Sequence, residues 1–142
     1  MKNSDYVLDA NVVMSLLIGG KATTFSFLDQ FNFYSSDFII NELDLYTELI
    51  RKKTKFSDEQ LSAYTLNVFR RLTILPRLVI SESVLKQAEQ LCLGIDIKDT
   101  AYVAVPLQFG FPLVTRDKQL HTGLRRKGFR NVLLFDEFLA SI

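Results

Sequence analysis

Cysteine and histidine are nearly absent from this sequence of 142 residues, in which Cys92 and His121 are the only ones. A single cysteine excludes a disulfide framework and a thiolate metal cluster, and it favours a cytoplasmic protein. A single histidine excludes a zinc site built mainly from imidazoles. Any metal ion that the chain binds must therefore be held chiefly by oxygen.

Long hydrophobic runs are also missing. Apolar residues make up 48% of the chain, but Asp, Asn or Gly interrupts their runs well short of the ~20 residues of a membrane-spanning helix. The few residues before the first predicted strand leave no room for a signal peptide. Length and apolar content instead predict one globular domain over residues 1–142, with no membrane segment.

Charge is nearly balanced at +1, but the basic residues are unevenly distributed. Between residues 116 and 130 the only acidic residue is Asp117. This basic segment could contact nucleic-acid phosphates, or it could be an ordinary solvated helix face, and the sequence leaves both interpretations open. The candidate nucleic-acid-binding residues are Arg116, Lys118, Arg125 and Arg126.

Short apolar segments that fit strands alternate with segments of helical periodicity. The predicted strands are residues 6–8, 33–35, 73–75, 112–115 and 132–135. This alternation predicts an α/β fold, a doubly wound parallel sheet of about five strands flanked by helices and joined by right-handed crossovers. Two of the helices, residues 38–53 and 58–72, are expected to form a helical hairpin.

Local signals place several helix ends. Ser57 begins a capping box, and Asp37 and Asp136 are expected to cap the helices that follow them. Pro106 falls within the helical pattern that begins near Asp96. It is expected to kink or end that helix, because proline lacks the backbone N–H and clashes with the preceding turn.

Asp9 stands where the first strand gives way to a helix. Its short carboxylate could cap that helix, which is the more common role of an Asp at such a position. In open α/β sheets, however, ligands bind beyond the carboxyl ends of the strands, where Asp9 lies. Asp117 repeats this arrangement, because it follows the predicted strand 112–115 and precedes another helix.

Two further acids lie on helix faces that should point toward the core. Glu42 falls among the apolar residues of segment 38–53, and Asp99 shares a ridge of a largely apolar helix. A core-side carboxylate is costly unless it is paired, although a Glu can also extend to solvent or meet a Lys or Arg. Asp96 is the expected cap of its helix, which leaves Asp99 without a routine structural role.

These two strand ends and two helix faces can meet at one edge of a doubly wound sheet. Clustered carboxylates repel one another, so the cluster persists by binding protons or a divalent cation. Ligation by oxygen alone favours Mg²⁺ or Mn²⁺, and such ions activate water for attack on phosphodiesters. The residues therefore suggest metal-assisted phosphoryl chemistry.

Four segments of the chain resemble the motifs of the PIN-domain nucleases, and within that family those of the small VapC-like ribonuclease toxins. In chain order they are residues 7–12 (VLDANV), 40–43 (INEL), 99–104 (DTAYVA) and 111–117 (FPLVTRD). The Asp-Ala-Asn opening and the strand-Thr-Arg-Asp segment are the most specific. The resemblance implies an Mg²⁺- or Mn²⁺-dependent endoribonuclease, a hydrolase that cleaves RNA.

The resemblance also implies which residues form the site. The catalytic residues and metal ligands would be Asp9, Glu42, Asp99 and Asp117. Asn11 and Thr115 would orient those carboxylates through hydrogen bonds. Two features depart from the family pattern, because Pro106 interrupts a helix that usually runs on and Asp96 competes with Asp99 as a ligand.

The predicted hairpin carries apolar residues off its main apolar faces, namely Leu45, Ala63 and Leu66. Exposed apolar patches usually mark an interaction site, although the same side chains could complete the monomer's own core. In the family that the chain resembles, such a region takes part in dimerisation and can receive an inhibitory peptide. We therefore expect a homodimer, and an antitoxin-like protein that binds along the hairpin if the chain is the toxin of a toxin–antitoxin pair.

Other interpretations account for less of the sequence. A phosphotransferase of the haloacid-dehalogenase kind needs a second acid two residues after Asp9, where this chain has Asn11. A response-regulator receiver needs paired acids near its first strand, and they are missing. A non-catalytic PIN-fold module that binds nucleic acid or a partner stays open, although it would leave all the candidate acids without a function.

Overall fold

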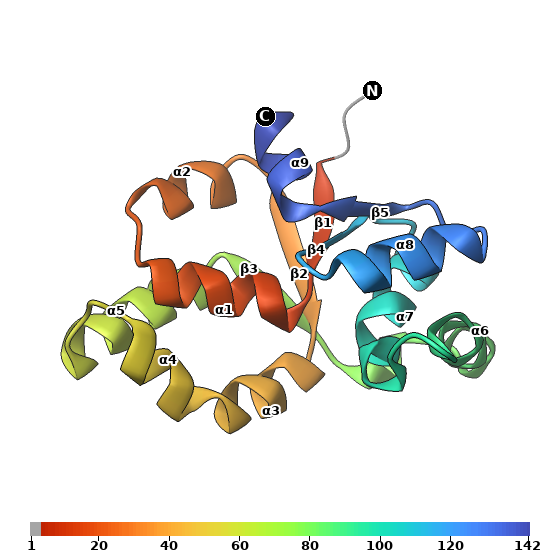
Figure 1. Ribbon diagram of the computed structural model, residues 1–142, viewed down its shortest axis with the longest axis horizontal. Helices are drawn as coiled ribbons and strands as arrows, with labels where there is room; N and C mark the ends of the chain where they lie inside the picture. The colour runs from red at the N-terminus through yellow and green to blue at the C-terminus, as the bar shows by residue number, and fades with distance from the viewer. Residues whose placement is uncertain (1–3) are drawn as a thin grey trace.

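One parallel sheet organises the computed structural model, which describes residues 4–142 (Figure 1). Its strands are β1 (Asp5–Leu8), β2 (Asn32–Ser36), β3 (Leu72–Leu75), β4 (Leu113–Thr115) and β5 (Val132–Leu134), in the order β3-β2-β1-β4-β5. β1 is central, because Val7 pairs with Tyr34 of β2 on one side and with Leu113 of β4 on the other. Residues 1–3, which belong to the short segment expected before the first strand, lie outside the described residues.

Helices cover both faces of this sheet. They are α1 (Ala10–Gly19), α2 (Thr23–Leu28), α3 (Phe38–Leu45), α4 (Thr47–Lys53), α5 (Asp58–Phe69), α6 (Glu82–Cys92), α7 (Thr100–Phe109), α8 (Lys118–Arg126) and α9 (Phe135–Ala140), with short 3-10 helices η1 (Arg77–Val79) and η2 (Ile97–Asp99). Figure 1 shows α1 and α3–α5 on one face and α6–α8 on the other, which confirms the predicted doubly wound α/β fold. None of the helices within residues 4–142 is long and apolar enough to cross a membrane.

An aromatic cluster packs near the amino ends of the strands. Between ring centroids, Tyr6 of β1 lies 5.3 Å from Phe31, 6.0 Å from Phe33 and 4.8 Å from Phe138. Phe27 of α2 joins the cluster, 5.9 Å from Phe33. Buried rings contribute a large apolar area and an additional edge-to-face attraction. The cluster therefore packs α2 and α9 against β1 and β2.

The strand order changes direction at β1. From β1 the chain adds β2 and then β3 on one side, and it then crosses to the other side to add β4 and β5. Such a reversal leaves a crevice outside the carboxyl ends of the strands beside it, here β1 and β4, and ligands of open α/β sheets bind in that crevice. Asp9 directly follows β1 and Asp117 closely follows β4, so the topology brings both to this crevice.

The single helix predicted over residues 38–53 is two helices, α3 and α4, with a break at Tyr46. Tyr46 has φ −104° and ψ 11°, and the Thr47 hydroxyl donates to the Leu43 carbonyl at 3.0 Å. A Thr hydroxyl that bonds back to the preceding turn weakens and often bends a helix. The sequence periodicity of one straight helix would place Tyr46 and Leu49 on its core face, but the break at Tyr46 leaves both exposed.

Pro106 does not end its helix, since α7 continues to Phe109. The residues around the proline are fully buried, with Val103 and Ala104 at 0% exposure. Helices in proteins are stabilised mainly by such tertiary packing, which here outweighs the hydrogen bond that Pro106 cannot make. Of the two expected outcomes, a kink or an end, the end at Pro106 is therefore wrong.

Two predicted N-caps are also wrong. Asp37 makes no capping hydrogen bond, because the neighbouring Ser36 Oγ accepts from the Phe38 N–H at 3.1 Å instead. Asp136 lies inside the first turn of α9 rather than before it. The capping box that begins at Ser57 is confirmed.

The end of α1 provides a test of local backbone geometry. Gly20 has φ +58°, a left-handed conformation that costs other residues about 1–2 kcal/mol, and a Cβ there would lie 2.7 Å from the Phe56 ring. We expect Gly20→Ala to lower the free energy of unfolding by about 1 kcal/mol or more in urea denaturation.

Gly19→Ala is the matched control, because a Cβ at this helical position meets no atom within 4 Å. Alanine is the better helix former, so this variant should be as stable as the wild type or more stable. Equal losses in the two variants would contradict this assignment of the α1 end.

Candidate active site

Asp9 is a buried carboxylate at the carboxyl end of the central strand. The residue is 2% exposed, and its Oδ1 caps α1 by accepting from the Val12 N–H at 3.2 Å. Its other oxygen, Oδ2, is buried with no hydrogen-bond partner among the described residues. Burial raises the pKa of Asp9 from 3.8 to about 7, although the Thr115 side chain and the Val12 N–H oppose the change. A buried carboxylate oxygen without a partner favours binding of a proton or a cation.

Asn11 and Thr115 connect the first turn of α1 to the end of β4. Asn11 Oδ1 accepts from the Arg116 N–H at 3.0 Å, and its Nδ2 donates to Thr115 Oγ1 over 3.5 Å. Thr115 Oγ1 also accepts from the Asp117 N–H at 3.1 Å. Asp117 in turn caps α8, because its Oδ1 accepts from the Leu120 N–H at 3.0 Å. The network fixes the two strand ends, and the acids that follow them, relative to each other.

Glu42 and Asp99 approach this crevice from opposite faces of the sheet. Glu42 is half-buried on α3, and Asp99 is half-buried where η2 leads into α7. Burial, followed by the charges of Asp96, Asp117 and Glu42, raises the pKa of Asp99 to about 7. The charges of Asp99 and Asp117 also raise the pKa of Asp9. The predicted site residues thus lie within electrostatic reach of one another.

Asp96 and Asp99 differ in what their carboxylates do. Asp96 caps η2, with its Oδ1 accepting from the Lys98 N–H at 3.0 Å, as the sequence predicts. Asp99 precedes α7 but makes no capping hydrogen bond through its side chain. Asp96 therefore has a structural role, whereas the Asp99 carboxylate is free to bind a ligand.

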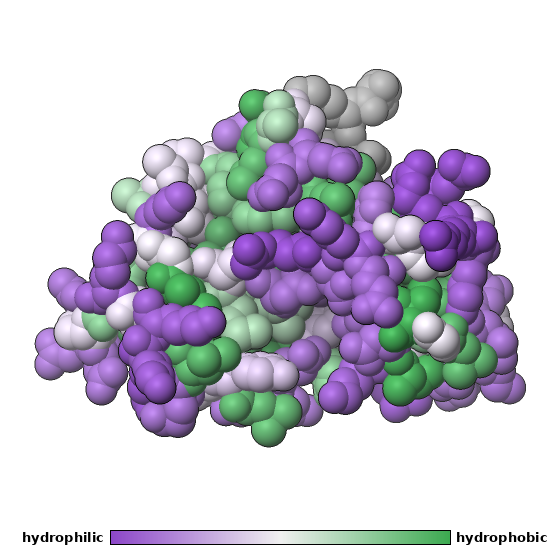
Figure 2. Space-filling view, viewed as in Figure 1, coloured by the Kyte–Doolittle hydropathy of each residue, from purple (hydrophilic) through white to green (hydrophobic). Residues whose placement is uncertain are grey.

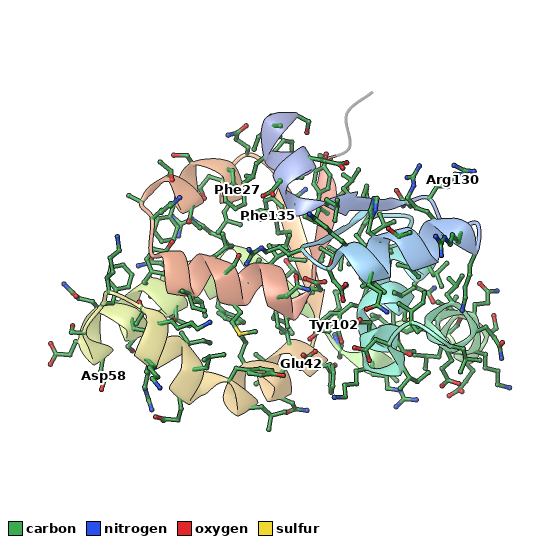
Figure 3. All side chains as sticks on the ribbon, in the orientation of Figure 1. Phe27, Glu42, Asp58, Tyr102, Arg130 and Phe135 are labelled. Atoms are coloured by element: carbon green, nitrogen blue, oxygen red, sulfur yellow. The ribbon has the colours of Figure 1, made fainter. Side chains whose placement is uncertain are left out.

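Tyr102 is a polar residue of this site that the sequence pattern did not single out. It follows Asp99 by one turn of α7, is 1% exposed, and has a buried hydroxyl with no hydrogen bond of good geometry to a described residue. Burial raises the pKa of Tyr102, and the nearby Glu42 raises it further. Figure 3 shows Tyr102 and Glu42 close together between α7 and α3. Its only sequence signal is a hydroxyl-bearing ring among the apolar residues of α7.

The acids at this edge of the sheet have the oxygen ligands that a divalent cation needs, but they are too far apart to share one ion. Mg²⁺ and Mn²⁺ prefer the oxygen ligands that Asp and Glu supply, and Asp9 Oδ2 is a buried oxygen without a partner. Within residues 4–142, however, no three Asp, Glu, His or Cys side chains are arranged to hold one ion together. Binding of a shared ion would require these carboxylates to move closer together.

The candidate nucleic-acid-binding residues line more than one hollow of the surface. All of them are exposed, and Figure 2 shows hydrophilic side chains over α8 and between α8 and α1. Arg116 lines a cleft of about 690 Å³ bounded by α1, α2 and α9. Lys118 and Arg126 line a different hollow beside α8, and Arg125 donates to a backbone carbonyl that precedes β5. Arg116 and Lys118 flank Asp117 directly in the sequence.

The sequence profile of the PIN domain matches residues 7–135, and this match includes all the candidate site residues. The chain therefore belongs to the PIN-domain family, whose members are generally nucleases, and the family predicted from the sequence motifs is confirmed. No curated protein matched the sequence.

Solved structures with the same fold include PAE2754 from Pyrobaculum aerophilum, with a TM-score of 0.67 and 16% identity over 96% of this chain and 88% of that one. A toxin-antitoxin complex from Klebsiella pneumoniae gives a TM-score of 0.59 and 14% identity over 90% and 95% of the two chains. VapBC2 from Rickettsia felis, bound to a promoter DNA fragment, gives a TM-score of 0.57 and 18% identity over 92% of this chain and 96% of that one. At such low identities these similarities establish the fold.

The raised pKa of Asp9 leads to a prediction for the metal-free protein. A carboxyl group with a pKa of 3.8 when unfolded and about 7 when folded stabilises the fold fully below the lower value. This stabilisation is lost as the pH rises through the higher one. In EDTA, we expect the free energy of unfolding to fall across this window by up to ~4 kcal/mol for this group.

Asp9→Asn keeps an oxygen that can cap α1 but cannot ionise, so it should flatten the pH dependence in urea denaturation between about pH 4 and about pH 8. Asp136→Asn removes an exposed carboxylate from α9 and should keep the wild-type slope. Identical slopes in the wild type and Asp9→Asn would show that burial does not raise the pKa of Asp9.

Proposed function

We propose that this chain is an Mg²⁺- or Mn²⁺-dependent endoribonuclease that cleaves RNA phosphodiester bonds at the carboxyl edge of its sheet. One observation carries the proposal, namely that the unpartnered, buried carboxylate of Asp9 lies within electrostatic reach of other acids at the topological crevice. Membership of the PIN-domain family supports it. The proposed catalytic residues and metal ligands are Asp9, Glu42, Asp99 and Asp117.

The residues around these acids have positioning roles in this proposal. When bound, a divalent cation supplies an activated water molecule and neutralises charge on the phosphate. Asn11 and Thr115 hold the ends of β1 and β4 together, which keeps the strand-end acids in place. The Tyr102 hydroxyl is placed to donate to Glu42 and thereby to restrict the orientation of that carboxylate.

The cleft that Arg116 lines supports an RNA substrate. Lys21 and Lys53 line it too, and none of the three forms an ion pair in the part of the chain that the structure describes. Hydroxyl groups of Ser15 and Thr23 lie along the same cleft. Cations and hydroxyls bind phosphates without reading the bases, so this cleft suits an RNA backbone. Further contacts are proposed for the other exposed cations of the C-terminal segment, Lys118, Arg125 and Arg126.

A cleavage assay tests the proposal directly. The wild type should cleave members of an RNA panel in Mn²⁺ and should stop in excess EDTA. Asp9→Asn and Asp117→Asn should each lose about 10³-fold or more of that activity. Both variants should remain folded, because Asn retains an oxygen that can cap the following helix. Glu59→Gln, which changes an exposed acid in the first turn of α5 outside the Arg116 cleft, is the matched control and should stay active.

Cleavage that persists in EDTA, or full activity in both variants, would contradict the proposed site. Binding of RNA without cleavage of any RNA or DNA would instead favour a non-catalytic PIN module. Metal binding has a readout of its own, since Mn²⁺ should raise the melting temperature of the wild type and of Asp96→Asn. It should do so much less in Asp99→Asn, because that variant loses the acid that has no capping role.

A groove along the helices after β2 is the proposed site of a protein partner. It has a volume of about 520 Å³ between α1, α3, α4 and α5. Ile40 and Leu66, which line it, are 44% and 53% exposed, and Leu45 on α3 is 81% exposed. One structure with this fold is a toxin-antitoxin complex. We infer that this chain is the toxin of such a pair and that an antitoxin-like protein fills the groove.

The same exposed apolar residues predict self-association. Light scattering at roughly tens of micromolar protein should report a dimer of the 16.3 kDa chain. Leu45→Glu combined with Leu66→Glu should shift it toward monomer without changing the effect of Mn²⁺ on the melting temperature. Leu78→Glu changes a residue that is 94% exposed on η1, away from the groove, and should leave the dimer intact. A monomeric wild type would refute the dimer.

A further inference from the structure

A second hollow lies at the carboxyl ends of β2 and β3, beside the proposed site. Its volume is about 530 Å³, within the ~300–1,000 Å³ typical of small-molecule sites. Residues of α3, η1, α6, η2 and α7 line it. We call it the base pocket and define it by the six lining residues on which the argument depends, Phe38, Asn41, Arg77, Glu89, Lys98 and Ala104.

The base pocket shares two elements with the carboxylate cluster. Asn41 on α3 immediately precedes Glu42, and Lys98 immediately precedes Asp99. Two residues that line the pocket are therefore chain neighbours of Glu42 and Asp99, the acids that approach the crevice from opposite faces of the sheet. The lining also includes Thr100 and Ala101, so it flanks Asp99 on both sides in the chain.

The walls of the base pocket are apolar and its rim is polar. Ala104 at 0% and Val105 at 2% exposure belong to the core, and Phe38 packs against that core. The polar rim residues Asn41, Arg77, Lys98 and Glu89 are exposed. An apolar slot with a few polar groups at its mouth suits a flat aromatic ring that also carries hydrogen-bonding groups.

The rim groups are free to bind such a ligand. Over residues 4–142, the side chains of Asn41, Arg77, Lys98 and Glu89 make neither a hydrogen bond nor an ion pair with one another or with the rest of the protein. Arg77 and Lys98 supply positive charge for a phosphate. Glu89 and the Asn41 carbonyl oxygen accept hydrogen bonds. The exocyclic amino groups of adenine, cytosine and guanine can donate them, whereas uracil has no exocyclic amino group and only its ring N3–H to donate.

We propose that the base pocket binds a nucleobase carrying an exocyclic amino group, from the nucleotide next to the RNA phosphate that is cleaved. Arg77 and Lys98 would hold that nucleotide's own phosphate at the pocket mouth. This inference rests on the proposed ribonuclease function and adds the base preference that the Arg116 cleft, with its contacts to the backbone, does not provide.

Direct binding is measured by titrating nucleoside 5′-monophosphates into the full chain in EDTA and following the backbone amide NMR signals of Ala101 and Ala104, which line the pocket. AMP, CMP and GMP should shift these signals and bind about fivefold or more tightly than UMP. Ala101→Leu, which fills the pocket, and Arg77→Gln, which removes a phosphate contact, should each weaken binding about tenfold. The matched controls Ala140→Leu and Arg70→Gln change exposed residues at the ends of α9 and α5, and they should bind like the wild type.

A second arm uses short RNAs that differ at one base beside the cleaved phosphate. Ala101→Leu should reduce the discrimination against uracil while keeping the Mn²⁺-induced rise in melting temperature. Equal binding of all nucleotides, shifts confined to residues outside the pocket, or no binding at all would overturn the base pocket even if the enzyme cleaves RNA. Base-selective binding at these amides without any RNA cleavage would support the pocket and overturn the proposed ribonuclease function instead.

Discussion

The burial of one carboxylate at the end of the central strand is the constraint around which this structure is arranged. Asp9 accepts a hydrogen bond from the first turn of α1, but its second oxygen is buried without a partner. Burying an ionised carboxylate is costly, and the nearby Asp99 and Asp117 add repulsion rather than compensation. Positive charge at this edge is therefore stabilising. Bound protons supply it at low pH, and a divalent cation would supply it at neutral pH.

The cost of this charge cluster is offset by apolar packing in the rest of the fold. Aromatic rings from β1, β2, α2 and α9 pack together near the amino ends of the strands. At the carboxyl end, the reversal of strand order opens a crevice, and the hydrogen bonds of Asn11 and Thr115 hold its two sides together. Apolar packing of the scaffold thus supports the charge cluster, which is the usual relation between scaffold and functional site.

Local signals in the sequence were sufficient for the strands, for Asp9 and Asp117 at the strand ends, and for the N-caps at Ser57 and Asp96, because each depends on a few neighbouring residues. Features that depend on distant packing were not predictable in this way. Pro106 stays in a helix because buried neighbours hold it there, and Tyr46 breaks a helix whose periodicity continues through it. The place of Tyr102 beside Glu42 follows only from the packing of α7 and α3 at the same edge. The motifs identified the family, while the arrangement of side chains within the site required three dimensions.

The distribution of positive charge around the site suggests how an anionic substrate could overcome its repulsion by the acids. The lining of the Arg116 cleft includes the residue before Asp117, and the lining of the base pocket includes the residues before Glu42 and Asp99, with Arg77 and Lys98 at its mouth. Cations thus flank the acids on two sides. An RNA strand that occupied both the Arg116 cleft and the base pocket would gain binding energy from the cations there. Those contacts would offset the repulsion between the acids and the phosphate that lies between the two places. A cation held by the acids would remove that remaining repulsion, which explains physically why metal and RNA should bind to this edge cooperatively.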